Sequence, residues 1–144
     1  MRLQRTSEDA RILARLRKLC LALPGAAETL TWGHPNFRVD GKIFAGYGLQ
    51  AGHRTISGKV GKDRQRTLIR DRRYLYSDYV GRFGWVSFIL EGRIDWNEVA
   101  GLMLSSYRLI ATRKRLADLE RESTDTVRRG SIGRRKGGRR RQKA

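Results

Sequence analysis

The sequence predicts an α+β fold with a single antiparallel sheet and helices packed on one of its faces, and three observations indicate it. Residues 7–23 and the segment that follows residue 95 carry apolar side chains at helical spacing. Between them, short apolar runs alternate with turn residues, as strands do. Helices at both ends of a run of strands are typical of a two-layer sandwich, in which the other sheet face stays open.

The first helix is expected to run from about Ser7 to Leu23. Its serine is a good N-cap, the two acidic residues that follow suit the positive end of the helix dipole, and a Pro-Gly pair follows the last leucine. The buried stripe of this helix includes Ile12, Leu16 and Cys20. The lone cysteine excludes an internal disulfide and a multi-cysteine zinc site, and its place on the stripe predicts a buried structural thiol.

A hairpin is predicted at 36–45, where Asp40-Gly41 separates two short strands. This dipeptide favours a two-residue turn with positive φ at both positions, and such a turn fixes the register of the strands. The predicted pairs across the hairpin are Val39 with Lys42, Arg38 with Ile43, and Phe37 with Phe44. Because the apolar side chains of the hairpin must face the core, Arg38 is expected on the open face.

The other elements follow from the same signals. A short strand is expected at 29–32, a turn at 47–53, a strand at 55–60, a short helix at 62–70 and an irregular aromatic loop at 74–83. Residues 85–90 form the most apolar strand. Asp95 is then the N-cap of the last helix, with Glu98 as its capping-box partner, and this helix is expected to end at about Arg121.

Charge is the strongest signal in the composition. The chain has 32 Lys and Arg against 14 Asp and Glu, which gives a net charge of +18. Such an excess favours a polyanionic partner, nucleic acid before an anionic membrane. Nine of the 32 basic residues lie in 126–144, which has no acidic residue, so +9 remains on 1–125. We predict a folded domain at 1–125 and a disordered basic arm at 126–144, with a solvated tail without function as the alternative.

Catalysis and metal binding find little support in the sequence. The chain has two histidines and one cysteine, and a Cys–His nucleophile pair would need an exposed Cys20. The glycines and lysines at 58–62 lack the spacing and the hydroxyl of a phosphate-binding loop. The first helix has only Glu8 and Asp9 as acidic residues, among several basic ones, whereas a hard cation requires clustered carboxylates. We therefore expect no enzyme, no catalytic residue, no metal and no cofactor.

The chain is expected to be cytoplasmic and to have no membrane partner. No apolar run reaches the roughly 18–20 residues that span a bilayer. The first residues lead into an amphipathic segment that contains arginines, which differs from a secretory signal peptide. A monomer is assumed, because no sequence feature indicates an oligomer.

Three segments carry a resemblance to a known family: LCLALPGAAETLTWGHPNFRVDGKIFA, YVGRFGWVSFIL and DWNEVAGLMLSSYRLIATRKRL. With WGHPxF, GKxFA, GW and SYRL in that order, the chain resembles the MmcQ/YjbR family over roughly residues 10–116. The resemblance implies a fold like that of CyaY, the bacterial frataxin, and a DNA-binding role. The mitomycin-resistance connection in the family's name also implies a second possibility, a small-molecule-binding or drug-sequestering protein.

The sequence thus predicts a non-enzymatic nucleic-acid-binding protein of low sequence specificity, with DNA as the favoured partner. The contact residues expected on the sheet are Arg38, Lys42, Lys59 and Trp85. Those expected on the arm are Arg128, Arg129, Arg134, Arg135, Lys136, Arg139, Arg140 and Arg141. An acidic protein partner or ribosomal RNA is a third possibility.

Three aromatic side chains keep two interpretations each. Trp85 faces outward if Val86 and Phe88 fill the core, and is itself a core residue in the opposite phase. His34 is expected to be a turn residue that holds a backbone carbonyl, rather than a ligand or general base. Trp32 is expected in the core. The small-molecule alternative instead places a pocket at Trp32, His34 and Trp85.

Overall fold

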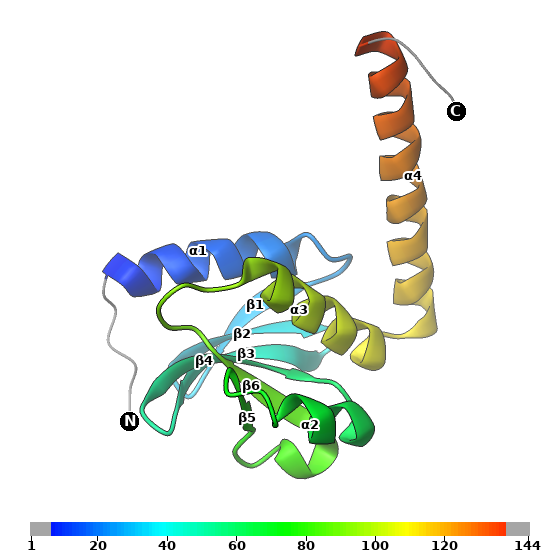
Figure 1. The fold of residues 1–144 in the computed structure, drawn as a ribbon. Helices are drawn as coiled ribbons and strands as arrows, with labels where there is room; N and C mark the ends of the chain where they lie inside the picture. Colours follow the sequence, from blue (N-terminus) through cyan, green and yellow to red (C-terminus); the bar gives the residue numbers. More distant parts are fainter. Residues whose placement is uncertain (1–6, 138–144) are drawn as a thin grey trace. The chain divides into compact units, whose positions relative to one another are not determined.

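The structure, a computed structural model, describes residues 7–137 and divides into two compact units after Ala111. The elements along the chain are α1 (Ser7–Leu21), β1 (Ala27–Thr31), β2 (His34–Val39), β3 (Lys42–Gln50), β4 (His53–Lys59), α2 (Lys62–Leu68), β5 (Tyr74–Tyr76), the 3-10 helix η1 (Gly81–Phe83), β6 (Trp85–Ile89), α3 (Trp96–Ile110) and α4 (Arg113–Gly137) (Figure 1). In these described residues no helix is both long and apolar enough to cross a membrane.

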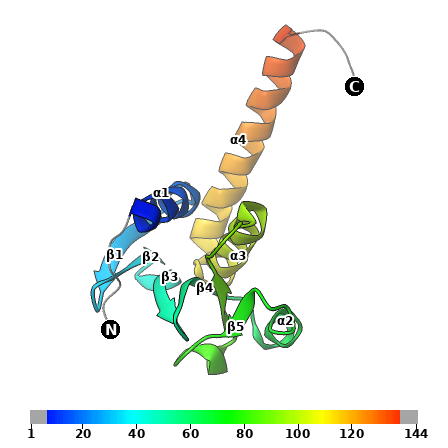
Figure 2. The ribbon, with the colours of Figure 1, turned by 60° about the vertical axis from the view of Figure 1, so that its left-hand side comes forward.

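The first unit contains one six-stranded antiparallel sheet in the order β1-β2-β3-β4-β6-β5. Helices α1 and α3 cover one face of it (Figure 1), and Figure 2 shows α2 beside β5 at the edge of the sheet. The predicted mixed α+β class with a single antiparallel sheet is confirmed. The finer likeness to CyaY stays a prediction.

The ladder pairs define the two faces of the sheet. One row, on the helix-covered face, joins Tyr47, Ile56, Phe88 and Tyr74 across four strands, and all four side chains are buried. The neighbouring row on the opposite face joins Asn36, Gly46, Ser57 and Ser87. We call this second face the open face, because α1 and α3 lie on the other one (Figure 1); the loop 77–80 lies over part of the open face.

Three successive hairpins join β1 to β4 through two-residue turns in which both residues have positive φ. The turns are Trp32-Gly33, Asp40-Gly41 and Ala51-Gly52. The primed turns that such angles build match the right-handed twist of the strands. The predicted turn at Asp40-Gly41 is confirmed. The prediction that Trp32 lies in the core is wrong, because the turn leaves its side chain 92% exposed.

Two of the three predicted pairs across the β2–β3 hairpin are confirmed, namely Val39 with Lys42 and Arg38 with Ile43. The third is wrong, because Phe37 pairs with Ala45 and not with Phe44. A β-bulge shifts the register here and inserts one extra residue into β3. The bulge lets Phe44 and Ala45 both be buried, and the Phe44 ring packs edge-on against Tyr107 at 5.4 Å between centroids.

Two segments predicted as loops contain strands. The expected turn at 47–53 begins instead with the second half of β3, which continues to Gln50. Its glycines suggested a break, but β3 pairs with a strand on each side, and these ladders outweigh the weak strand preference of glycine. The aromatic loop expected at 74–83 contains β5, which pairs with β6 and forms the edge of the sheet.

The predicted last helix consists of two helices. The Asp95 carboxylate caps α3 by accepting hydrogen bonds from the backbone N–H groups of Asn97 and Glu98, both at 3.2 Å. The N-cap is thus confirmed, whereas the Glu98 carboxylate contacts Tyr74 instead of closing a capping box. α3 ends at Ile110, because the backbone of the next residue, Ala111, is extended. The sequence signal for the start of a new helix was Thr112, an N-cap residue type whose hydroxyl accepts a hydrogen bond from the N–H of Arg115.

The second unit contains α4, which continues to Gly137 and does not end near Arg121. The arm predicted as disordered, 126–144, is therefore helical in its backbone as far as Gly137, and 138–144 lie outside the described residues. The helix has no proline after its start, and arginine, leucine and glutamate are strong helix formers. The division of the chain falls after Ala111, earlier than the predicted boundary at 125.

Candidate nucleic-acid interface

Strand β6 presents Trp85 to the open face. Val86 and Phe88 are buried on the helix-covered face, so Trp85 and Ile89 lie on the other side, each half-buried. Of the two phases that the sequence left open, the structure has the outward one. Ser87 shares this phase but is buried, because Ser77 and Gln50 cover it.

Lys59 lies directly opposite Trp85 in the antiparallel β4–β6 ladder, and both side chains are on the open face. The backbone at Lys59 is held in place, since its N–H donates to Ser106 Oγ at 2.8 Å. The buried Ser106 hydroxyl in turn donates to the carbonyl of Phe44 at 2.6 Å. α3 thus fixes the end of β4, where a cation and an aromatic ring stand side by side.

Arg38 is on the same face, as predicted from the hairpin. Its guanidinium donates from Nε to Thr29 Oγ1 at 3.2 Å and from Nη1 to the carbonyl of Gly41 at 3.0 Å. These bonds use two of the five N–H donors of the side chain, which leaves donors for another partner. Lys42 is exposed beside the same turn.

The structure does not bring together the three residues of the predicted pocket. His34 lies in β2, with its ring 3.6 Å from the position that a Cβ on Gly48 would take. Gly48 pairs with Thr55, which in turn pairs with Ile89. Ile89 is four residues from Trp85, a distance of about 13 Å along β6. Trp32 is exposed at the β1–β2 turn. Trp85 therefore lies away from His34 on the sheet, and the pocket at Trp32 and His34 stays a prediction.

The expected hydrogen bond from His34 to a backbone carbonyl is not made by Nδ1. This atom is buried and has no hydrogen-bond partner among the residues that the structure describes. His34 is a strand residue rather than a turn residue, because the turn is formed by the two residues before it.

The residues predicted on the arm remain untested. Five of them, Arg128, Arg129, Arg134, Arg135 and Lys136, belong to the backbone of α4. The other three, Arg139, Arg140 and Arg141, lie outside the described residues.

A hollow of about 180 Å³ that the sequence did not predict lies on the open face, between the sheet and the loop 77–80. Gly46 and Gly48 form part of its floor, and Tyr79 lines it with a side chain that is 94% exposed. Gln50 holds the loop, since its Nε2 donates to the carbonyl of Tyr76 at 2.7 Å, at the end of β5, and its Oε1 accepts from the N–H of Asp78 at 3.3 Å. The hollow is thus part of a fixed surface.

A cationic groove lies between α1 and residues 92–97, and sequence reasoning missed it too. The Arg15 guanidinium stands 4.7 Å from the centroid of the Trp96 ring. Two hollows of about 290 and 540 Å³ share Arg15, Ile94 and Trp96; Arg11 lines the first and Arg93 the second. The available signal was the spacing of Arg11 and Arg15, which puts both on one face of α1.

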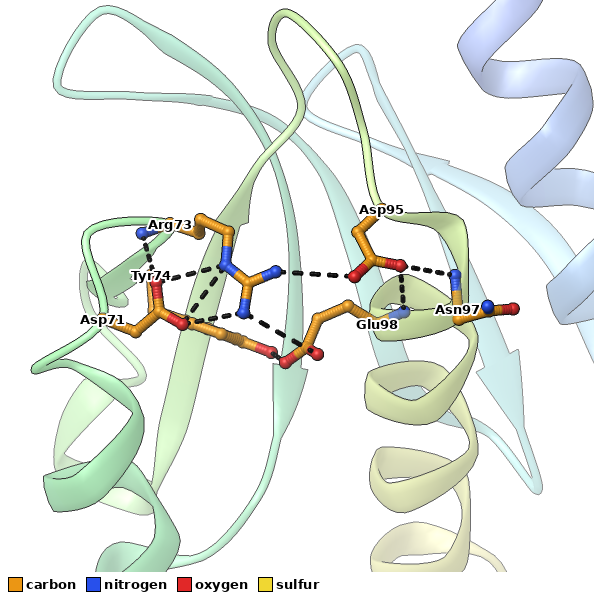
Figure 3. A network of polar contacts seen from close by, with 6 residues as sticks. All are labelled: Asp71, Arg73, Tyr74, Asp95, Asn97 and Glu98. Carbon is orange, nitrogen blue, oxygen red and sulfur yellow. Dashed lines mark hydrogen bonds and ion pairs between the residues drawn. The ribbon is translucent and has the colours of Figure 1, made fainter.

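Charged groups also meet at β5 and the start of α3, where they form a structural network (Figure 3). Arg73 pairs with Asp71 at 2.8 Å and lies 3.7 Å from Asp95 and 3.8 Å from Glu98. The hydrogen bonds to Asp71 raise the pKa of the Arg73 guanidinium. Burial and the Glu98 carboxylate together raise the pKa of Tyr74. This arrangement keeps Tyr74 protonated and joins the sheet edge to α3.

Comparison with known proteins finds one family model and a solved structure that are similar to this chain. A family model described as YjbR matches residues 21–109, from the end of α1 to α3. The crystal structure of Deinococcus radiodurans protein DR2400, with a DUF419 domain, is similar with a TM-score of 0.61 and 22% sequence identity, over 80% of this chain and 88% of that chain. At this identity the likeness concerns the fold. No match was found among curated proteins.

Proposed function

The chain belongs to the YjbR family, and we propose that it is a non-enzymatic protein that binds nucleic acid, DNA in the first place, with little sequence specificity. The observation that carries the proposal is the pair of Lys59 and Trp85 on the open face of a chain with a net charge of +18. A lysine neutralises phosphate whatever the sequence, and an aromatic ring beside it offers a surface for an unpaired base. The basic residues of 126–144 would add further phosphate contacts.

A binding role agrees with the state of the reactive side chains. Cys20 is fully buried, and burial raises the pKa of its thiol to about 12, so it is not a thiolate at neutral pH. His53 Nδ1, at the start of β4, lies 2.8 Å from a carboxylate oxygen of Glu91, which follows β6, and both side chains are 42% exposed, as in an ordinary surface contact.

A second candidate is the binding of a small molecule in the hollow beside Tyr79. The glycine floor of the hollow and the unpartnered Nδ1 of the neighbouring His34, considered within the described residues, favour it. The volume of about 180 Å³ is smaller than the 300 Å³ or more of pockets that enclose drug-sized ligands. We therefore place nucleic-acid binding first.

The first prediction concerns salt. We expect the full chain to bind a labelled DNA duplex at low salt, with an affinity that falls steeply between about 50 and about 200 mM salt, because phosphate contacts release counterions. Fluorescence anisotropy with duplex DNA, single-stranded DNA and RNA measures both the affinity and the preference among the three. Binding that does not respond to salt would count against the phosphate mechanism and favour the small-molecule alternative.

The second prediction concerns the open face. Lys59→Glu should weaken DNA binding about tenfold at low salt and lower the salt slope by roughly one unit, since one phosphate contact is lost and a repulsive charge replaces it. Arg72→Glu changes the net charge equally at an exposed site in the α2–β5 connection, and we expect it to weaken binding at most about twofold. Equal losses in the two variants would mean that only overall charge matters and that the open face is not the site.

A further inference from the structure

We propose that the groove between α1 and residues 92–97 binds one single strand of nucleic acid, with an unpaired base stacked on Arg15 and phosphates on Arg11 and Arg93. The inference rests on the proposed function and adds a second contact surface, formed by the helix layer instead of the open sheet face. We call it the arginine groove and define it by Arg11, Arg15, Arg93 and Trp96.

The stacking surface is organised before any ligand arrives. The Arg15 guanidinium lies over the Trp96 ring at 4.7 Å, and Trp96 is half-buried at the first position of α3. The ring supports one side of the guanidinium, and because Arg15 is exposed, its other side is open to solvent. Bases of single strands stack on arginine planes as they do on aromatic rings. Less side-chain entropy is lost on binding, because the guanidinium is already held.

Positive charge flanks this surface on both sides. Arg11 is one turn before Arg15 on α1, Arg93 lies on the β6–α3 connection, and both are exposed. Neither has a carboxylate partner in the part of the chain that the structure describes. Two arginines around one stacked base fit the phosphates on either side of a nucleotide in a strand.

The two acidic groups that line the groove are already engaged elsewhere. A Glu8 carboxylate oxygen lies 3.8 Å from an Arg54 nitrogen, and Asp95 caps α3 while it faces Arg73 at 3.7 Å. Three arginines against these two carboxylates leave the lining of the groove with a net charge of +1 (3 − 2). A cationic surface with this balance attracts an anion.

The shape of the groove favours a strand over a single nucleotide. Its two hollows, of about 290 and 540 Å³, adjoin at Arg15 and extend to either side of it. A duplex would keep its bases stacked inside and could reach only the flanking arginines, so single strands should profit most. Arg11 and Arg15 precede the residues that match the family model, 21–109, so the groove is not contained in that segment.

Arg15→Lys is the main test, since it keeps the charge and removes the planar surface. We expect the full chain with this change to bind a labelled oligothymidine about tenfold more weakly than the unmodified chain, with the salt slope and duplex affinity little changed. Arg11→Gln with Arg93→Gln should instead lower the single-strand salt slope by roughly 1.4 units, at about 0.7 per phosphate. Arg70→Gln with Arg72→Gln removes the same charge from exposed sites outside the groove and is the matched control.

The outcomes separate the two proposals. If Arg15→Lys binds oligothymidine like the unmodified chain while Lys59→Glu weakens binding, the arginine groove is wrong and the open face stands. A loss for the groove pair no greater than for its control would also overturn the groove. If adenosine monophosphate bound as tightly as a longer oligonucleotide, the groove would be a site for a single nucleotide, and the proposal that it binds a nucleic-acid strand would be wrong. If the unmodified chain binds none of these probes, the proposed function fails and the groove with it.

Discussion

Gly84→Ala should lower the free energy of unfolding by about 3 kcal/mol or more, because two costs act together at this position. Gly84 has a φ of +88°, a conformation that strains any residue with a Cβ. An added Cβ would lie 2.8 Å from the Cα of Gly61 and 2.9 Å from its carbonyl carbon. Backbone atoms cannot rotate out of the way as a side chain can, so β4 and β6 must move apart. Urea unfolding followed by tryptophan fluorescence measures the loss.

The close approach of Gly84 to Gly61 also positions residues of the open face. The carbonyl of Gly84 accepts hydrogen bonds from the N–H of Val60 at 2.9 Å and of Gly61 at 3.1 Å. These bonds join the end of β4 to the start of β6, where Lys59 and Trp85 stand opposite each other. A shift at Gly84 should therefore weaken DNA binding in the fraction of protein that remains folded.

Gly52→Ala is the control that separates strain from crowding. Gly52 has a φ of +80°, close to that of Gly84, but no atom lies within 4 Å of an added Cβ. Only the conformational cost of about 1 kcal/mol should then appear. If the two variants lost equal stability, the contact between Gly84 and Gly61 would not be a determinant of the fold.

The hairpins show how far the sequence predicts local structure. Asp40-Gly41 was predicted as a turn because aspartate and glycine both tolerate positive φ, and the structure has φ values of 52° and 79° there. Trp32 and Ala51 adopt a similar φ without belonging to the residue types that favour it. In both turns the glycine that follows was the available signal. The pairing of the flanking strands imposes the positive φ on the residue before each glycine, Trp32 or Ala51.

The open face was predictable and the arginine groove was not. Alternation along β6 and β4 limited Trp85 to two phases and placed Lys59 on the open face, and the ladder between the two strands selects the outward phase of Trp85. The groove depends on Arg15 and Trp96, which lie in different helices and meet only through the packing of the fold. Helical periodicity put Arg15 on a polar face of α1, but it carries no information on which aromatic ring that face meets.

Asp9 shows the same limit for a buried group. The sequence assigned it to the first turn of α1, where an acid favours the helix dipole. In the structure it is fully buried and joins α1 to the sheet. Its Oδ1 accepts hydrogen bonds from the Tyr47 hydroxyl at 2.6 Å and from Arg54 Nε at 2.7 Å. Both partners are far away in the sequence, so local patterns could not predict the pair.

Asp9→Ala should therefore destabilise the fold by about 3–5 kcal/mol, the range found when one partner of a buried ion pair is removed. The change leaves the buried Tyr47 hydroxyl and the largely buried Arg54 guanidinium without this acceptor. Asp9→Asn keeps an acceptor oxygen for one of the two and should cost less. Urea unfolding of the three proteins gives the ranking.

Glu28→Ala is the matched control for this prediction, since it breaks another ion pair between α1 and the sheet. Arg17 Nε and Glu28 Oε1 are 2.6 Å apart, as close as the Asp9 contacts, but the two side chains are 40% and 23% exposed. Water screens such a pair and solvates the partner left behind, so its loss should cost at most about 1 kcal/mol. The difference between the two variants measures what burial adds at equal distance. If Asp9→Ala cost no more than Glu28→Ala, the buried carboxylate would not be what holds α1 on the sheet, and apolar packing of the helix would carry that role.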